Sequence, residues 1–194
     1  MRRVLVLGDT HVPDRAHSLN PVLKKLIEDQ KPWDVVAFTG DLTGEEVLQW
    51  VKSLGREVYV VRGNMDYLPL PKTAVFEVEG LKFGVHHGDG VYPRGDTKTL
   101  TRIADSLGVD VLLTGHTHAD FVKPGTGGKK LLVNPGSLTG VWGGGGGSYT
   151  PSFMELVVVP GTLQLVLYKH ARGRIEVRKY AITRSGESFT VREL

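Results

Sequence analysis

The chain has 194 residues, of which 40% are hydrophobic and 23% charged, with a net charge of +3 and no cysteine. This length and composition fit one compact globular domain, and they exclude a disordered chain and a disulfide-stabilised one. The apolar run after Met1 is too short for a signal peptide and leads directly into Gly8-Asp9, so we expect a cytoplasmic protein without a membrane segment. Without thiolates, any metal must be bound by His, Asp, Glu, Asn or backbone oxygen.

The positive charge is concentrated near the C-terminus. From Tyr168 onward there are seven Lys or Arg residues and three Glu residues. We expect residues 168–194 to be a basic, strand-rich extension of a single domain spanning residues 1–194, with its charges on a solvated strand edge. Aromatic residues lie between these cations (Tyr168, Tyr180 and Phe189) and leave a nucleic acid partner open as an alternative.

The first half of the chain alternates strand and helix patterns. Short apolar runs predict strands over Arg3–Leu7, Asp34–Phe38 and Glu57–Val61. Between them, apolar residues recur at helical spacing over Leu19–Asp29 and Gly44–Leu54. Such alternation predicts βαβ units and a sheet with parallel strands at its centre.

The second half is richer in strands. A hairpin is predicted from Ala74–Val78 and Leu81–His86, followed by a helix over Thr97–Leu107. Further strands are predicted over Asp110–Thr114, Lys130–Val133, Ser152–Val159, Leu163–Tyr168 and Arg174–Ile182. The whole pattern predicts an α/β fold with a two-layer β core flanked by helices and mixed sheet connections.

Five consecutive glycines, Gly143–Gly147, form the single low-complexity segment. Such a run cannot pack a core and gives the backbone great freedom. We expect a plain flexible loop here, with a mobile flap near the active site as the alternative.

Polar motifs follow the predicted strands at the points where those strands end. They are Gly8-Asp9-Thr10-His11, Gly40-Asp41, Gly63-Asn64-Met65-Asp66, His86-His87-Gly88-Asp89 and Gly115-His116-Thr117-His118. In sheets of this type the carboxyl ends of the strands share one edge, and ligands bind in the crevice there. We therefore expect these side chains to converge although they are far apart in sequence.

The spacing within the motifs suits metal binding. Asp9 and His11 are two residues apart, so an extended backbone would point both side chains the same way, and the His116 and His118 pair repeats this. The preceding glycines would let the chain turn sharply. Taken singly, each motif has an ordinary structural explanation, such as a solvated Asp–His pair. Five of the seven histidines fall in these motifs, and this concentration favours a metal site.

The candidate ligands are Asp9, His11, Asp41, Asn64, His87, His116 and His118. They are too many for one tetrahedral zinc site. They suit two cations about 3.5–4 Å apart that share a bridging carboxylate. Asp41 stands alone between the paired motifs, and we expect it to be the bridge.

The ordered set of motifs resembles the calcineurin-like metallophosphoesterases. Asn134-Pro135-Gly136-Ser137 and Pro151-Ser152 are similar to the YfcE-type phosphodiesterase subgroup, and the likeness runs from Met1 to about Tyr168. The segment Gly8–Ile27 also resembles the small retromer subunit, a related eukaryotic scaffold protein. The resemblance implies a four-layer αββα sandwich.

The resemblance also implies how the ligands divide. Asp9, His11 and His118 would hold one metal, and Asn64, His87 and His116 the other, with Asp41 between them. His87 is preferred to His86 because it matches the His that precedes Gly in the family pattern. Mn²⁺ is our first expectation, and Ni²⁺, Fe²⁺ or Zn²⁺ also fit a mixed set of nitrogen and oxygen ligands.

One position departs from the wider family. Many members carry a proton-donating His directly after Gly-Asn, where this chain has Met65. Met65 is either a simple packing residue or a sign of a restricted substrate range, and we favour the second interpretation, in which the leaving group needs little protonation. Asp66 would orient a neighbour or partly substitute as the donor, and a structural hydrogen-bonding role is equally open. Asn64, Asp66 and His87 are therefore the candidates for a catalytic role.

The predicted function is metal-dependent hydrolysis of a small phosphodiester by a hydroxide shared between two divalent cations. Asn64, His87 and His116 would border the phosphate. Two alternatives remain: a non-catalytic, retromer-like scaffold that binds protein partners, and a nuclease that uses the basic tail. The sequence leaves the oligomeric state open, with a homodimer as one option.

Overall fold

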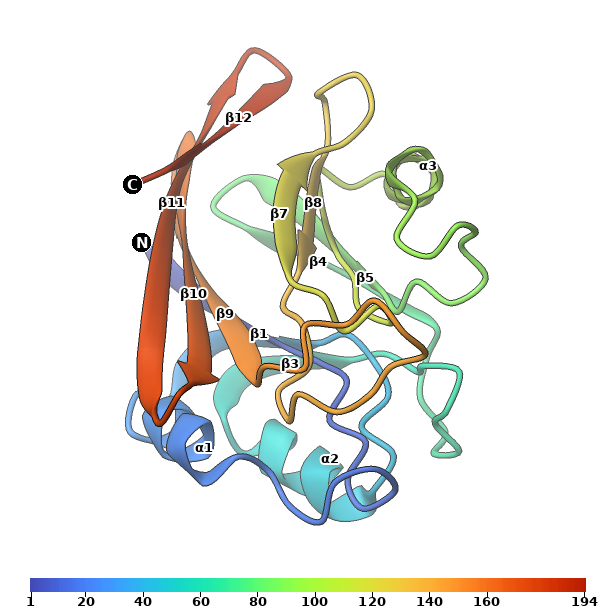
Figure 1. The fold of residues 1–194 in the computed structure, drawn as a ribbon. Coiled ribbons are helices and arrows are strands. Elements are labelled where there is room, and N and C mark those ends of the chain that lie inside the picture. Colours follow the sequence, from blue (N-terminus) through green and yellow to red (C-terminus); the bar gives the residue numbers. More distant parts are fainter.

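The computed structural model describes all residues from 1 to 194, and Figure 1 shows two β-sheets packed against each other. The helices are α1 (Pro21–Glu28), α2 (Glu45–Lys52) and α3 (Thr97–Leu107). The strands are β1 (Arg2–Leu7), β2 (Trp33–Phe38), β3 (Gly55–Val60), β4 (Thr73–Val78), β5 (Leu81–His86), β6 (Val111–Leu113), β7 (Phe121–Pro124), β8 (Leu131–Asn134), β9 (Ser152–Val159), β10 (Thr162–Ala171), β11 (Arg174–Ser185) and β12 (Ser188–Glu193). A seven-stranded sheet has the order β12-β11-β10-β9-β1-β2-β3, and a five-stranded sheet has the order β4-β5-β6-β8-β7.

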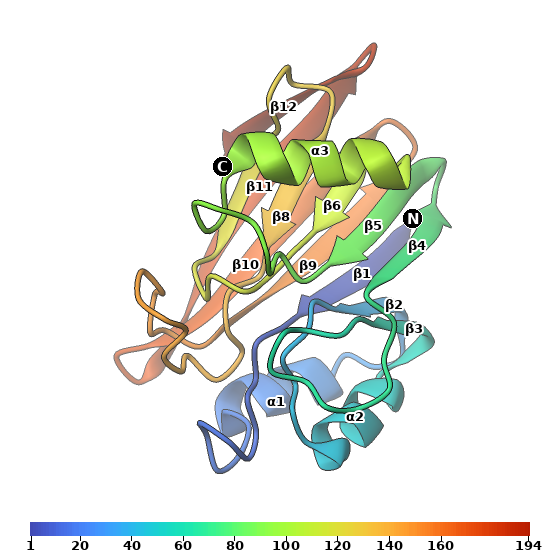
Figure 2. The ribbon, with the colours of Figure 1, turned by 90° about the vertical axis from the view of Figure 1, so that its right-hand side faces the viewer.

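The two sheets form the inner layers of a four-layer sandwich. In Figure 2, α1 and α2 cover the outer face of the seven-stranded sheet and α3 covers the outer face of the five-stranded sheet. The space between the sheets is filled by a core of 22 buried residues. Strand β1 shows the pattern, because Val4 and Val6 enter this central core while Leu5 and Leu7 pack toward α1 and α2. The predicted four-layer α/β fold is confirmed.

Parallel strands at the centre of each sheet place the polar motifs. Strand β2 pairs in parallel with β1 and with β3, and β6 pairs in parallel with β5 and with β8. The carboxyl ends of all six strands lead into loops at one edge of the sandwich. The predicted convergence of the motifs follows from this topology.

The sequence prediction missed two strands and placed the start of one helix too early. Strand β7 was not predicted, because it is short, half-buried and ends in Pro124. Strand β12 was not predicted either, and it pairs with a β11 that continues to Ser185. Helix α1 begins at Pro21 because the Asn20 side chain accepts hydrogen bonds from the amides of Val22 and Leu23 and so caps it.

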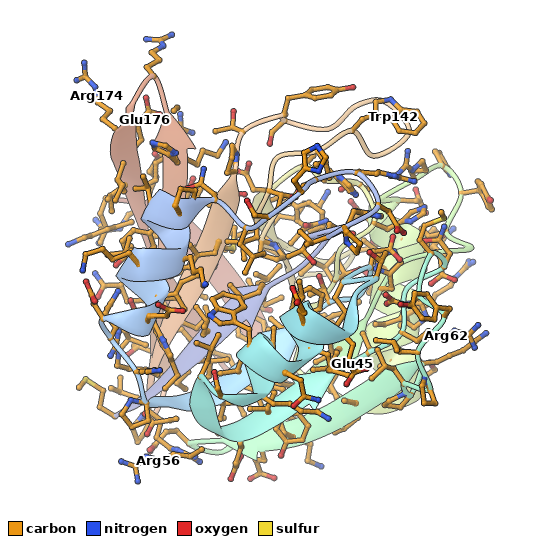
Figure 3. All side chains as sticks on the ribbon, turned by 90° about the horizontal axis from the view of Figure 1, so that it is seen from below. Glu45, Arg56, Arg62, Trp142, Arg174 and Glu176 are labelled. Carbon is orange, nitrogen blue, oxygen red and sulfur yellow. The ribbon has the colours of Figure 1, made fainter.

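The basic C-terminal segment completes the seven-stranded sheet. Figure 3 shows Arg174 and Glu176 projecting from the far end of the β10–β11 hairpin. Its aromatic residues face inward: Phe189 is buried, and the Tyr168 ring stacks on Phe153 at 4.7 Å. These rings are therefore not free to stack on bases, which weakens the nuclease alternative. The longest helix has 11 residues, and none of the helices has the length and apolar character needed to cross a bilayer.

Candidate metal centre

The structure brings all seven candidate ligands together at the carboxyl edge of the two sheets. Asp9 and His11 follow β1, Asp41 follows β2, and Asn64 lies beyond the end of β3. On the other sheet, His87 follows β5, while His116 and His118 lie beyond β6. Two groups of three ligand atoms result, each with its atoms within 4.8 Å of one another: Asp9, His11 and His118, and Asp41, His87 and His116.

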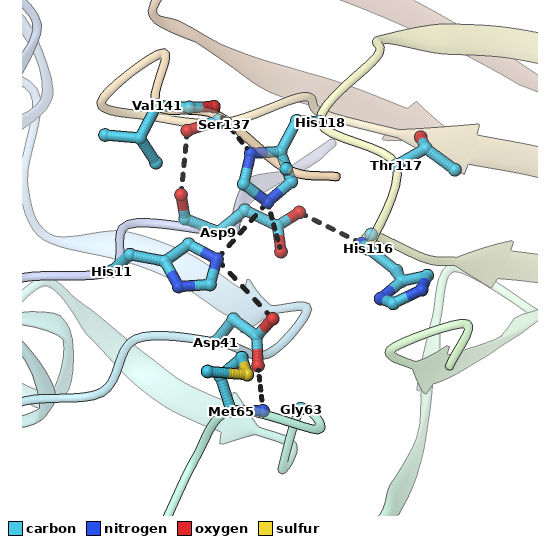
Figure 4. Close-up of polar contacts among 12 residues, drawn as sticks. Asp9, His11, Asp41, Gly63, Met65, His116, Thr117, His118, Ser137 and Val141 are labelled. Carbon is cyan, nitrogen blue, oxygen red and sulfur yellow. Dashed lines mark hydrogen bonds and ion pairs between the residues drawn. The ribbon is translucent and has the colours of Figure 1, made fainter. Parts of the chain in front are cut away.

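The first group is fully buried. Nε2 of His11 lies 3.2 Å from Nε2 of His118, and Oδ1 of Asp9 lies 3.5 Å from the same His118 nitrogen (Figure 4). Two imidazole nitrogens and a carboxylate oxygen thus face one small volume. A divalent transition metal prefers this mixture of donors.

The second group is centred on His87, whose Nε2 atom contacts three possible ligands. It lies 3.1 Å from Oδ2 of Asp41, 3.1 Å from Oδ1 of Asn64 and 3.2 Å from Nδ1 of His116. Asn64 therefore lies beside this group. Its neighbour His86 lies outside, with its Nδ1 accepting a hydrogen bond from the amide of Gly88.

Asp41 lies between the two groups. Its Oδ2 atom is 3.5 Å from Nε2 of His11 and 3.1 Å from Nε2 of His87. Its other oxygen accepts a hydrogen bond from the backbone amide of Met65 at 2.9 Å, visible in Figure 4. One carboxylate thus faces a histidine of each group, which is the position that a bridging ligand needs.

The predicted reason for the Asp-x-His and His-x-His geometry was wrong. These residues are not extended: φ is 51° at Asp9, 46° at His11, 73° at His116 and 57° at His118. Asp41 also has a positive φ, of 61°. Residues other than glycine rarely adopt this left-handed region, and such strain persists only where the surrounding structure imposes it, often at functional sites. The side chains converge because the backbone coils tightly after each strand.

The glycines before the ligands serve mainly to leave space rather than to turn the chain. A Cβ atom on Gly63 would lie 2.1 Å from Oδ1 of Asp41, and one on Gly115 would lie 2.9 Å from Oδ2 of Asp9. Among the four glycines that precede a ligand, Gly40 alone has a positive φ, of 108°. Larger residues at Gly63 or Gly115 would occupy the volume of the metal ligands themselves.

Backbone carbonyls orient two of the imidazole rings. Nδ1 of His87 donates to the carbonyl of Thr39 at 2.8 Å. Nδ1 of His118 donates to the carbonyl of Val141 at 2.8 Å, and Figure 4 shows these two residues. Each bond fixes the ring so that Nε2 faces the cluster. This is the arrangement that metal-binding histidines in proteins use.

An unpartnered buried atom supports a cation in the first group. Oδ1 of Asp9 is buried without a hydrogen-bond partner. A buried polar atom without a partner costs free energy, and native proteins contain few of them. A cation beside Asp9 would satisfy its free oxygen, so this donor set fits the divalent metals that the motifs predict.

The pKa values of the clustered side chains, taken without a bound metal, are set mainly by burial and by the neighbouring charges. Burial raises the pKa of Asp9 to about 7 and lowers the pKa values of His11 and His116 to about 4. Burial also acts to lower the pKa of His87, but the hydrogen bond to Asp41 and the charges of Asp9 and Asp41 outweigh it and raise this pKa to about 9. The cluster thus holds protons that a cation would have to displace.

Asp66 is placed beneath the ligands rather than among them. Its Oδ2 atom accepts hydrogen bonds from the amides of Asp41 and Gly63, both at 2.8 Å, and its Oδ1 atom accepts from the amide of Thr43 at 2.9 Å. Both carboxylate oxygens are therefore occupied by backbone amides. This favours the structural alternative for Asp66 over proton donation.

Several residues at the site were not identified from the sequence. Arg94 donates to the carbonyls of His116 and Gly143 and so ties the histidine loop to the glycine run. Asn134 donates to the carbonyl of Gly115 at 3.1 Å, and Ser137 donates to the carbonyl of Asp9 at 2.7 Å. The motif that contains Asn134 and Ser137 was noted only for its family resemblance and was given no role at the site, although it also follows a strand. Arg94 carried no such signal.

The glycine run lies against the site. A Cβ atom on Gly143 would be 2.4 Å from the His118 ring, and the amide of Ser148 donates to the carbonyl of His118 at 3.0 Å. The segment that was expected to be a plain flexible loop therefore contacts the candidate ligand His118 through both of its ends. The loop also borders an open cleft of about 270 Å³ that leads to the cluster, lined by Arg15, Asp41, Asn64, Met65, Tyr92, Arg94, His116, His118, Trp142, Gly143 and Gly144.

The sandwich fold and the two groups of candidate metal ligands are those of the metal-dependent phosphoesterase class. The chain belongs to the calcineurin-like phosphoesterase superfamily, whose domain model matches residues 1–165. A probable metallophosphoesterase of Methanocaldococcus jannaschii is 43% identical over 134 residues, which are 69% of this chain and 67% of that protein. The family resemblance seen in the motifs is confirmed.

Solved structures of vacuolar protein sorting 29 (Vps29) share the fold. Vps29 of Entamoeba histolytica in complex with Zn²⁺ has a TM-score of 0.84 and 34% identity, covering 92% of this chain and 98% of that one. Vps29 of Cryptosporidium parvum has a TM-score of 0.87 and 28% identity, covering 94% and 98%. The chain is therefore similar both to a metallophosphoesterase and to Vps29 proteins.

Proposed function

We propose that this chain is a phosphodiesterase that works with two divalent cations, Mn²⁺ first among them. The position of Asp41 is the main support, because its Oδ2 atom faces His11 of one group and His87 of the other at 3.5 and 3.1 Å. One cation would be held by Asp9, His11 and His118. The other would be held by Asn64, His87 and His116, with Asp41 shared between them.

In this proposal the residues of the chain bind the cations and orient the substrate, and the cations would supply the chemistry of hydrolysis. Two bound cations would activate a water and neutralise charge on the phosphoryl oxygens. Asn64 and His116 line the cleft, so they would border the phosphate from the side of the second group. The carbonyls of Thr39 and Val141 keep His87 and His118 in the tautomers that binding requires.

The preference for diesters with good leaving groups is supported by what surrounds Met65. Met65 lines the cleft and can donate no proton, and the neighbouring Asp66 uses both carboxylate oxygens on backbone amides. A leaving oxygen at this end of the cleft would find no strong acid there. Esters whose leaving groups need little protonation should therefore react fastest.

We propose that residues 1–194 act as one domain. Strands β10, β11 and β12 extend the sheet that carries Asp9 and Asp41, and the amide of Phe189 donates to the carbonyl of Gly128 in the five-stranded half. The basic segment thus helps to hold the two sheets together. Nothing in this arrangement requires it to contact substrate.

The test is hydrolysis of bis(p-nitrophenyl) phosphate by protein loaded with Mn²⁺ or Ni²⁺. We expect Asp41→Asn and His116→Ala to lose at least about a hundredfold in kcat/KM, by analogy with the loss of other electrostatic contacts in active sites. His17→Ala is the matched control, because His17 is exposed and lies outside both groups. Equal rates in all four proteins would reject the proposal.

A protein-binding scaffold is the second candidate, favoured by the similarity to Vps29. Under this alternative the metal groups would not turn over substrate. A Vps29 structure contains Zn²⁺, so bound metal alone does not decide between the two candidates. Turnover of a diester that disappears in Asp41→Asn would favour the enzyme, and metal binding without any turnover would favour the scaffold.

A further inference from the structure

Exposed aromatic side chains gather at the edge of the sandwich that carries the metal centre. Tyr67, Tyr92, Trp142 and Tyr149 are the four exposed aromatic residues, at 73%, 79%, 55% and 57% exposure. Each lies on a loop that also carries or borders a candidate ligand: Tyr67 beyond Asn64, Tyr92 beyond His87, and the other two on either side of the glycine run. The remaining aromatic residues are buried or half-buried. Exposed aromatic residues indicate a binding surface where they also line a cleft, and only two of these four do so.

Two of these rings line the cleft itself. Tyr92 and Trp142 line the cleft together with Met65 and two positively charged side chains, Arg15 and Arg94. Each arginine donates to backbone carbonyls rather than to a carboxylate: Arg15 to Trp142, and Arg94 to His116 and Gly143. The cleft thus combines aromatic surface with positive charge that no acidic side chain neutralises by direct contact.

Trp142 is held in place rather than loosely attached. Nη1 of Arg15 donates to its carbonyl at 2.8 Å, and the Arg15 guanidinium lies 5.2 Å from the centre of its ring. Arg94 holds the next residue, Gly143. Figure 3 shows the indole at the outer edge of the molecule, and 55% of Trp142 is exposed to solvent. An aromatic surface fixed in advance binds with a smaller entropic cost.

We propose that Trp142 and Tyr92 form a stacking platform for a nucleobase, so that the substrate is a nucleoside phosphodiester. This inference rests on the proposed function, since it places the phosphate at the metal centre and the nucleoside at the mouth of the same cleft. Base–aromatic stacking tolerates every base, because each base has a flat face. The enzyme should therefore distinguish nucleoside esters from alkyl esters more strongly than one base from another.

The test compares two substrates that share one leaving group. Thymidine 5′-(p-nitrophenyl phosphate) and methyl p-nitrophenyl phosphate both release p-nitrophenolate and differ in the group that is retained. We expect Trp142→Ala to lower the ratio of their kcat/KM values about tenfold, mainly through KM for the nucleoside ester. Tyr92→Ala should lower it in the same direction, and Trp142→Phe should restore most of it. Tyr149→Ala is the control, because Tyr149 is equally exposed on the same loop but does not line the cleft.

A binding measurement separates failure of this inference from failure of the proposed function. Equilibrium dialysis of the Mn²⁺-loaded protein would compare thymidine 5′-monophosphate with methyl phosphate, without any need for turnover. An approximately tenfold loss of nucleotide binding in Trp142→Ala, with Tyr149→Ala like wild type, would support the platform. An unchanged preference in Trp142→Ala and Tyr92→Ala would overturn it, even if all the esters are hydrolysed. If the wild-type protein binds thymidine 5′-monophosphate better than methyl phosphate but hydrolyses no ester, the result would count against the proposed phosphodiesterase activity.

Discussion

The carboxylate of Asp66 accepts a hydrogen bond from the backbone amide of Asp41 at 2.8 Å. Asp41 has a φ of 61°, a strained conformation for a residue other than glycine. The same oxygen of Asp66 also accepts from Gly63, whose missing side chain leaves room for the Asp41 carboxylate. Asp66 thus fixes the proposed bridging ligand through the backbone and acts as a positioning residue.

Replacing Asp66 tests this role against proton donation. We expect Asp66→Asn to lower the free energy of unfolding in urea by about 1–3 kcal/mol. The side-chain NH₂ group of Asn would face a backbone N–H group, and two donors cannot form a hydrogen bond with each other. Activity should fall by the same factor for p-nitrophenyl and for alkyl leaving groups. A loss confined to alkyl leaving groups, which need protonation, would identify Asp66 as the acid instead.

Introducing an acid at Met65 should widen the substrate range. Met65 lines the cleft and is 44% exposed, so Met65→His can be accommodated without disturbing the core. We expect this variant to raise kcat for alkyl leaving groups by about tenfold or more relative to p-nitrophenolate, because general acid catalysis matters most for poor leaving groups. Met65→Leu should leave that ratio unaltered. A ratio in Met65→His equal to that of wild type would show that no leaving group reaches this position.

Metal binding should release protons and strengthen as the pH rises. With a pKa of about 9, His87 is protonated at pH 7, and Asp9, with a pKa of about 7, is half protonated. His11 and His116, with pKa values of about 4, are already neutral and release nothing. Calorimetry in buffers of different ionisation enthalpy should therefore show roughly one to two protons released at pH 7, and fewer at pH 9. Release that does not change between these pH values would contradict the assignment.

The glycine run should be needed for metal affinity through His118. A Cβ atom on Gly143 would lie 2.4 Å from the His118 ring, so we expect Gly143→Ala to weaken metal binding by roughly ten- to a hundredfold. Gly145→Ala is the control, because its Cβ would meet nothing within 4 Å and its positive φ strains only the loop. Metal titrations of the two variants should differ clearly. If the two variants weaken metal binding equally, the contact between Gly143 and His118 does not contribute specifically to metal affinity.

Much of the site could be predicted from the sequence because the topology of the sheets determines where the residues after each strand lie. Once β1, β2, β5 and β6 were recognised as strands, the residues at their carboxyl ends were expected to converge, and the two sheets pack so that they do. Asp9, Asp41, His87 and His116 were found in this way, without knowledge of any distance. The same logic would have reached Asn134 and Ser137, which follow β8 and hold the backbone of the ligand loops.

The remaining features depend on tertiary contacts that leave no local pattern. The left-handed φ at Asp9 or His118 is imposed by the surrounding loops and contradicts the ordinary preference of these residues. The role of Arg94 arises because two distant loops meet at its guanidinium. Strand β7 escaped prediction because its half-buried, Pro-terminated segment becomes a strand only through pairing with β8.

The central claim is that Asp41 lies between two cations. A crystal structure of the protein soaked in Mn²⁺, with anomalous differences measured for manganese, tests it most directly. We predict two peaks about 3.5–4 Å apart, one beside Asp9, His11 and His118 and one beside Asn64, His87 and His116, with Asp41 contacting both. A single peak, or peaks that Asp41 does not contact, would contradict it.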